Sequence, residues 1–227
     1  MRADAAEVQL AASDRHAKRA LPMLKERMTP LLHGTKAVVV RLLRRPCQLA
    51  ASDLAISGPM ALGKEATGWL LGAAVTAGPG AEPLAWVGLP PVFAYHLVEV
   101  AFGAPPGVSK LYPRRDYPTP LEHETLWPAV EAFGRTLVRA LGFEGQAGLR
   151  IAPVPHPIVL ENYAGDESGV AFRAEVRLGE DSVEVGYLLA PKALDLLHAA
   201  ALGGDEQASR ERAASNMLAH LSGSEVT

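Results

Sequence analysis

The feature that most constrains the fold is a segment that occurs twice in the chain. Residues 84–103 read as a short apolar strand, a helix opened by proline, and a glycine stop. Residues 185–203 repeat this order one hundred positions later, with Pro91 matching Pro191, Leu97 matching Leu197, Phe102 matching Leu202, and Gly103 matching Gly203. Two copies are too few for a solenoid array, so the repeat predicts one domain built from two similar halves.

The duplication extends to the long helix that precedes each copy. Residues 29–43 match residues 127–141 at an offset of 98, through the pairs Pro30 and Pro128, Val40 and Val138, Arg41 and Arg139, and Leu43 and Leu141. Each half, about 22–103 and 119–203, therefore reads as helix, strand, strand, strand, helix. We expect an α/β domain in which antiparallel strands pair across a pseudo-twofold axis and long helices cover one face.

Proline positions suggest the boundaries of the first half. We expect a flexible lead over residues 1–13, a domain over 14–204, and a helical tail over 205–227 with its helix at about 206–221. Pro22 and Pro30 should break or kink the first helical region, leaving a main helix from about 30 to 45. The strands predicted to follow span residues 47–57, 67–76 and 84–89.

In the second half, turn and cap residues mark the elements. Thr119 with Glu122 three residues later predicts a capping box at the start of a helix over 120–141. An extended stretch is expected over 149–160. Residues 171–178 alternate apolar and charged side chains, as a half-buried antiparallel strand does, and return through a turn at 179–181 to a strand over 182–190.

Composition limits the function classes. The chain has 227 residues, of which 48% are hydrophobic, with no apolar run long enough to span a membrane and no signal-peptide pattern, so we expect a cytoplasmic protein. The single Cys47 is predicted to be a small buried residue. Residues 14–45 carry nine Lys or Arg and two acids, whereas residues 161–227 carry twelve acids and five Lys or Arg. This division fits either solvated faces or a head-to-tail contact between copies.

The sequence contains no catalytic, cofactor or metal motif. The seven histidines lack metal-ligand spacing, and the Gly78-Pro-Gly80 turn lacks the residues of a phosphate loop. Glu122 and Glu124 fall in the first turn of a helix, where the dipole favours acids. The basic helix ending at Arg45 lacks the interleaved aromatics of a nucleic-acid binder, so we expect no nucleic-acid partner.

Several of these segments together resemble the middle domain of the flagellar motor switch protein FliM. The resemblance covers about residues 20–202, and the segments that carry it are Leu42-Leu-Arg-Arg45, Leu89-Pro-Pro91, Leu97-Val-Glu-Val-Ala-Phe-Gly103, Tyr117-Pro-Thr-Pro-Leu-Glu122 and residues 185–197. It implies the fold that FliM shares with the chemotaxis proteins CheC and CheX. Residues 1–13 do not resemble the family's segment for phosphorylated CheY, and no FliN-like domain is recognised, so we expect no direct binding of phosphorylated CheY and no docking of FliN.

The resemblance also implies partners and a location. It implies a non-enzymatic component of the cytoplasmic C ring, peripheral at the flagellar basal body, that packs beside copies of itself or of FliM and contacts the rotor protein FliG. The family's FliG-contact loop falls on Phe102, Gly103, Ala104, Pro105, Pro106 and Gly107, with Ala104 where the family prefers a second glycine. A self-association surface is hypothesised at Arg41, Arg44 and Arg45.

The alternative is a stand-alone CheC-like protein that binds a response regulator. CheC-type phosphatases position water with an asparagine amide on their long helices. The asparagines here are Asn162 and Asn216, and neither falls on the helices over 30–45 or 120–141. Without that amide the water has no positioning partner, so we expect no phosphatase activity, and regulator binding stays open.

Overall fold

A computed structural model of the chain describes residues 2–58, 68–104, 118–146, 148–154, 168–179 and 181–200, with side chains from residue 17 onward. Its elements in order are α1 (Arg2–Leu43), β1 (Gln48–Ala51), β2 (Ala55–Ser57), β3 (Leu71–Thr76), β4 (Pro83–Leu89), α3 (Pro91–Ala101), α4 (Pro120–Leu141), β5 (Arg150–Val154), β6 (Gly169–Leu178) and β7 (Asp181–Leu189). A further helix covers 191–200.

The strands form one antiparallel sheet whose order confirms the two-half architecture. The order is β1-β6-β7-β4-β3-β5, with β2 also pairing with β6. The last strands of the two halves, β4 and β7, meet at the centre, and the first strands, β1 and β5, lie at opposite edges. The first strand of each half therefore pairs with the hairpin of the other half, so that neither half has a complete sheet alone.

The strand register locates the pseudo-twofold axis. Within the β4–β7 pair, Val87 lies opposite Tyr187, one hundred positions later in the chain. This is the same offset that separates Pro91 from Pro191. A residue that pairs with its own repeat counterpart lies on the symmetry axis, so the register agrees with the duplication predicted from the sequence.

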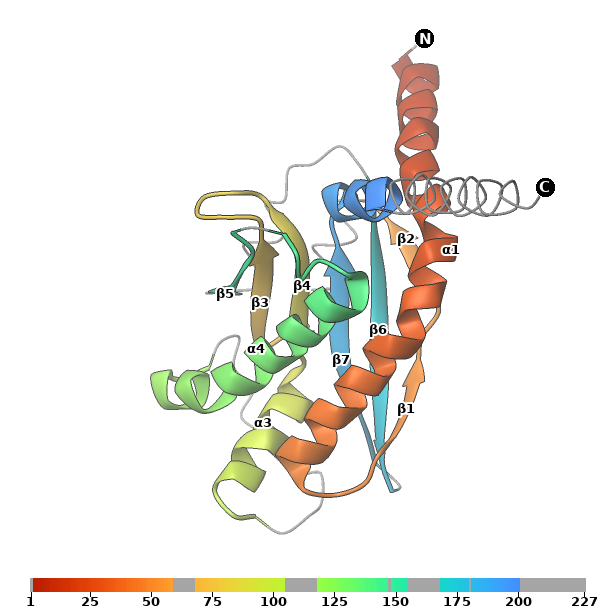
Figure 1. The fold of residues 1–227 in the computed structure, drawn as a ribbon. Helices are drawn as coiled ribbons and strands as arrows, with labels where there is room; N and C mark the ends of the chain where they lie inside the picture. The colour runs from red at the N-terminus through yellow and green to blue at the C-terminus, as the bar shows by residue number, and fades with distance from the viewer. Residues whose placement is uncertain are drawn as a thin grey trace, which may run out of the picture.

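The helices lie on one face of this sheet, as predicted. Figure 1 shows α1 and α4 side by side across the strands, with α3 below them. Their apolar faces and the inward strand positions form one core, which contains Leu31, Phe93, Phe133 and Leu137. The two long helices approach closely at Gly34, where a Cβ atom would lie 2.5 Å from Thr136 Cγ2.

The opposite face has a smaller apolar cluster around Trp69. A Cβ atom on Gly186 would lie 2.5 Å from Trp69 Nε1, and one on Gly88 would also collide with the indole. The ring therefore lies against bare backbone of β4 and β7, which glycine alone allows. Trp86 and Leu188 complete this second cluster.

Two helix boundaries confirm the capping predictions. At α4, the Thr119 N–H donates to Glu122 Oε2 at 2.7 Å, and the Glu122 N–H donates to Thr119 Oγ1 at 3.3 Å. At the end of α3, Gly103 adopts a left-handed conformation with φ +85°. Both signals depend on local backbone geometry, which a short sequence motif can specify.

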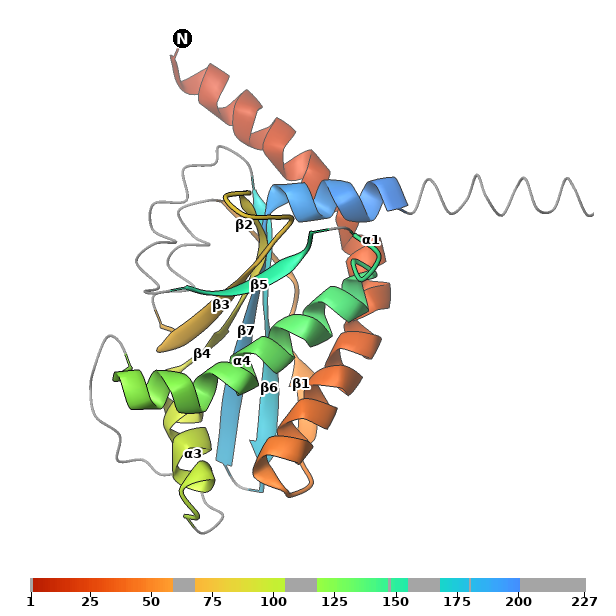
Figure 2. The same ribbon diagram turned by 60° about the vertical axis from the view of Figure 1, so that its left-hand side comes forward.

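Two sequence expectations differ from the structure, and the expected break or kink at the prolines is seen as a change of direction within one helix. Residues 2–13, expected as a flexible lead, belong to α1, and Pro22 and Pro30 lie inside this single 42-residue helix. Figure 2 shows that α1 changes direction along its length, as a proline-containing helix does when packing on a core compensates for the lost hydrogen bonds. The strand expected over 47–57 is instead two short strands. The expectations for 155–160 and 206–221 lie outside the described residues.

Candidate partner-binding surface

The described part of the predicted FliG-contact loop lies at the end of α3. The N–H of Gly103 donates to Val100 O at 3.0 Å, and the N–H of Ala104 donates to Glu99 O at 2.9 Å. These two bonds form a Schellman cap, which fixes the backbone just beyond the helix. Phe102 is held on this cap with 67% of its surface exposed. The positions predicted at 105–107 lie outside the described residues.

The predicted basic residues lie at the end of α1. Arg41 is in the last helical turn, and Arg44 follows the helix with φ 53°, the one left-handed non-glycine residue in the described part of the chain. The Nη2 atom of Arg45 lies 3.4 Å from Nε2 of His96, a buried residue of α3. Because a guanidinium only donates hydrogen bonds, Nε2 of His96 is the acceptor.

This contact joins the end of α1, where the predicted basic residues lie, to α3, which leads to the predicted loop. The cap with Phe102 ends α3. In both ribbon views these ends lie at the bottom of the molecule, away from the start of α1 (Figures 1 and 2). We call the region at this end of the molecule that contains Arg41, Arg44, Arg45 and Phe102 the basic end.

The corresponding end of the second half has different chemistry. Arg139, the counterpart of Arg41, donates from Nε to Glu144 Oε1 at 3.0 Å. Gly142, the counterpart of Arg44, takes the left-handed conformation with φ 76°. Arg41 and Arg44, by contrast, form no ion pair with any acid of the described residues. The basic end therefore differs from the equivalent end of the second half in its arginines, which form no ion pair with a described acid, and in its left-handed arginine.

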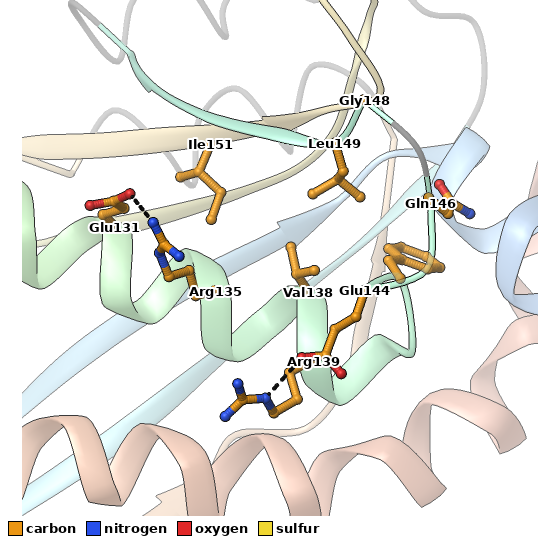
Figure 3. A pocket seen from close by; sticks show the side chains of 10 residues that line it. Glu131, Arg135, Val138, Arg139, Glu144, Gln146, Gly148, Leu149 and Ile151 are labelled. Atoms are coloured by element: carbon orange, nitrogen blue, oxygen red, sulfur yellow. Dashed lines mark hydrogen bonds and ion pairs between the residues drawn. The ribbon is translucent and has the colours of Figure 1, made fainter.

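A separate groove lies between α4 and the edge strand β5. It has a volume of about 430 Å³ and is lined by charged side chains and by apolar ones that include Leu149 and Ile151. Two ion pairs, Glu131 with Arg135 at 2.7 Å and Arg139 with Glu144, lie along its α4 side (Figure 3). Sequence reasoning did not identify this groove, because a helix and a strand from different segments meet there only in the folded chain.

The polar residues considered for chemistry have structural roles. Glu122 is part of the α4 cap, and His123 stacks on Trp127 with ring centroids 6.2 Å apart. Burial raises the pKa of the Cys47 thiol, which opposes formation of a nucleophilic thiolate. Among the described residues, no three His, Cys, Asp or Glu side chains are grouped to hold a metal. None of the described helices is long and apolar enough to cross a membrane.

Comparison with known proteins identifies the fold. No protein-family model matches the chain, and no curated protein matches it. A solved structure of a FliG–FliM complex from H. pylori contains a chain with TM-score 0.63 and 11% identity, covering 78% of this chain and 97% of that one. The structure of the FliM middle domain from H. pylori has a TM-score of 0.60 and 10% identity, covering 79% of this chain and 97% of that one. The structure of Thermotoga maritima FliY has a TM-score of 0.54 and 10% identity, covering 80% of this chain and 94% of that one. The predicted fold is therefore confirmed.

Proposed function

We propose that this chain, which has the fold of the FliM middle domain, is a non-enzymatic scaffold of the flagellar motor switch. It contacts FliG through the loop that begins at Phe102 and packs beside copies of itself or of FliM in the cytoplasmic ring at the basal body. The observation that carries this proposal is the exposed Phe102 on a fixed helix cap.

Phe102 has the physical character of an interface anchor. Burying a phenylalanine side chain against a partner is worth roughly 1.5–3 kcal/mol, and aromatic anchors held in a fixed backbone geometry lose little entropy on binding. The described aromatic side chains are otherwise buried or half-buried. The fixed cap therefore supports the proposal that this ring is presented to a partner.

The fold also supports a mechanical role. Each half completes the sheet of the other, and Thr35 of α1 is hydrogen-bonded to Tyr187 at the sheet centre with 2.7 Å between the two oxygens. A domain tied together in this way moves as one body. A tilt imposed by a neighbour at one side would then reach the loop at the end of α3 as a rigid rotation.

The test is binding to the purified middle domain of FliG, measured by pull-down and titration calorimetry. Phe102→Ser removes the exposed ring, and Gly103→Asp strains the cap. Gly142→Asp is the matched control, because it strains the left-handed cap at the end of α4 instead. All variants are first checked for folding by circular dichroism.

We expect wild type and Gly142→Asp to bind, and Phe102→Ser and Gly103→Asp to lose binding. If Phe102→Ser binds FliG as tightly as wild type does, the loop is not part of the contact. Failure of folded wild type to bind FliG, together with retention or dephosphorylation of phosphorylated CheY, would contradict the scaffold role and support the CheC-like alternative.

A further inference from the structure

The basic end carries charge that the rest of the described chain does not neutralise. Arg41 and Arg44 are exposed, Arg45 is half-buried, and no described acid forms an ion pair with any of the three. By contrast, Arg139, the counterpart of Arg41 in the second half, pairs with Glu144 at 3.0 Å. The arginines at the basic end are therefore available to an acid from another molecule.

The backbone at Arg44 argues against a purely local role for this charge. Its φ of 53° is a conformation that an L-residue adopts at a cost and glycine adopts freely. The second half places Gly142 at the same position. A helix dipole favours a cation in the last turn, and Arg41 already provides one. The dipole therefore accounts for Arg41 but does not require an arginine in the left-handed position.

Arg45 links this charge to the predicted loop contact. Its guanidinium reaches His96 on α3, the helix whose cap presents Phe102. Phe102 is the one exposed aromatic side chain among the described residues. A single exposed ring at the same end of the molecule as several cations fits a protein surface with acids around an apolar pocket better than it fits nucleic acid, where several rings stack on bases.

We propose that Arg41, Arg44 and Arg45 extend the loop contact, and that one partner surface covers them together with Phe102. This inference rests on the proposed function and specifies the chemistry of the partner: an acidic surface surrounding an apolar pocket for the phenyl ring. Charge pairs at the edge of a contact mainly set its association rate and salt dependence, while the apolar anchor mainly sets its lifetime.

The experiment titrates the full chain with the FliG middle domain at low and high salt. The variants are Arg41→Glu and Arg44→Gly, and the matched control is Arg139→Glu, which changes the pseudo-symmetric counterpart of Arg41. Thermal unfolding of each variant is measured in parallel. Arg44→Gly is informative because glycine relieves the backbone cost, so any loss of binding by this variant does not arise from loss of folding.

We expect Arg41→Glu to weaken binding about tenfold or more and Arg44→Gly to weaken it about threefold, with Arg139→Glu within about twofold of wild type. High salt should weaken wild type more than Arg41→Glu. If both arginine variants bind FliG with the affinity of wild type while Phe102→Ser loses binding, this inference is wrong and the proposed function stands. If the variants instead change only self-association of the chain in sedimentation, the arginines face another copy and the inference is wrong. Failure of wild type to bind would refute the proposed function itself.

Discussion

The hydrogen bond between Thr35 and Tyr187 offers the sharpest test of how the domain is held together. Tyr187 lies on the pseudo-twofold axis, fully buried, and its ring stacks on Phe172 with centroids 5.0 Å apart. Its hydroxyl and Thr35 Oγ1 are 2.7 Å apart, and Thr35 is also fully buried. The bond therefore joins α1 to the centre of the sheet without access to water.

Removing one partner should cost more than the bond itself contributes. A buried polar group left without its partner costs about 1–3 kcal/mol, whereas a hydrogen bond contributes about 1 kcal/mol net. Thr35→Val leaves the buried Tyr187 hydroxyl without a partner, and ring stacking holds that hydroxyl in place. We therefore expect the free energy of unfolding to fall by about 2–3 kcal/mol. Tyr187→Phe leaves Thr35, whose hydroxyl can turn to the carbonyl of the preceding helical turn, so we expect about 1–2 kcal/mol.

The assay is a double-mutant cycle by urea and thermal unfolding. At roughly 2–4 °C per kcal/mol for a chain of this size, the single variants should lower Tm by about 2–12 °C. The double variant removes both polar groups and should be more stable than the sum of the single losses predicts, by about 1–2 kcal/mol. Additive losses would show that the two hydroxyls act independently and would refute this reasoning.

Three further predictions concern the backbone and pH. Gly142→Ala should lower the free energy of unfolding by about 1–2 kcal/mol in urea titrations, because its φ of 76° strains any residue with a Cβ atom. Gly186→Ala should cost about 1–3 kcal/mol in the same assay because the new Cβ atom collides with the Trp69 indole, whereas Gly68→Ala, with no atom within 4 Å, should be near neutral. Burial raises the pKa of Tyr187, so the unfolded chain loses this proton first as pH rises. The free energy of unfolding should fall above about pH 10 by up to ~1.4 kcal/mol per pH unit, and Tyr187→Phe should lack this part of the slope.

Local patterns in the sequence predicted most of the elements. Proline and glycine marked α3, and Thr119 with Glu122 marked the start of α4. The repeat predicted the pseudo-twofold axis, which the pairing of Val87 with Tyr187 confirms. These features depend on neighbouring residues or on internal similarity, and both are visible in one sequence.

Features that depend on distant contacts were not predicted. The exchange of strands between halves depends on pairing of β1 with β6 and of β5 with β3, and no local pattern specifies that choice. α1 continues through Pro22 because packing on the core outweighs the lost hydrogen bond. The contact of Arg45 with His96 joins residues 51 positions apart, so the sequence alone did not indicate that the end of α1 touches α3.

The proposed contact between the end of α3 and FliG can be tested inside the cell. The most direct measurement is photo-crosslinking in the cells that produce this chain, with a benzophenone amino acid at position 102 and a control at position 175 on the helix-free face of the sheet. We predict a crosslink to FliG from position 102 and none from position 175. Crosslinks from position 102 to other proteins alone, or equal FliG crosslinking from both positions, would contradict the account.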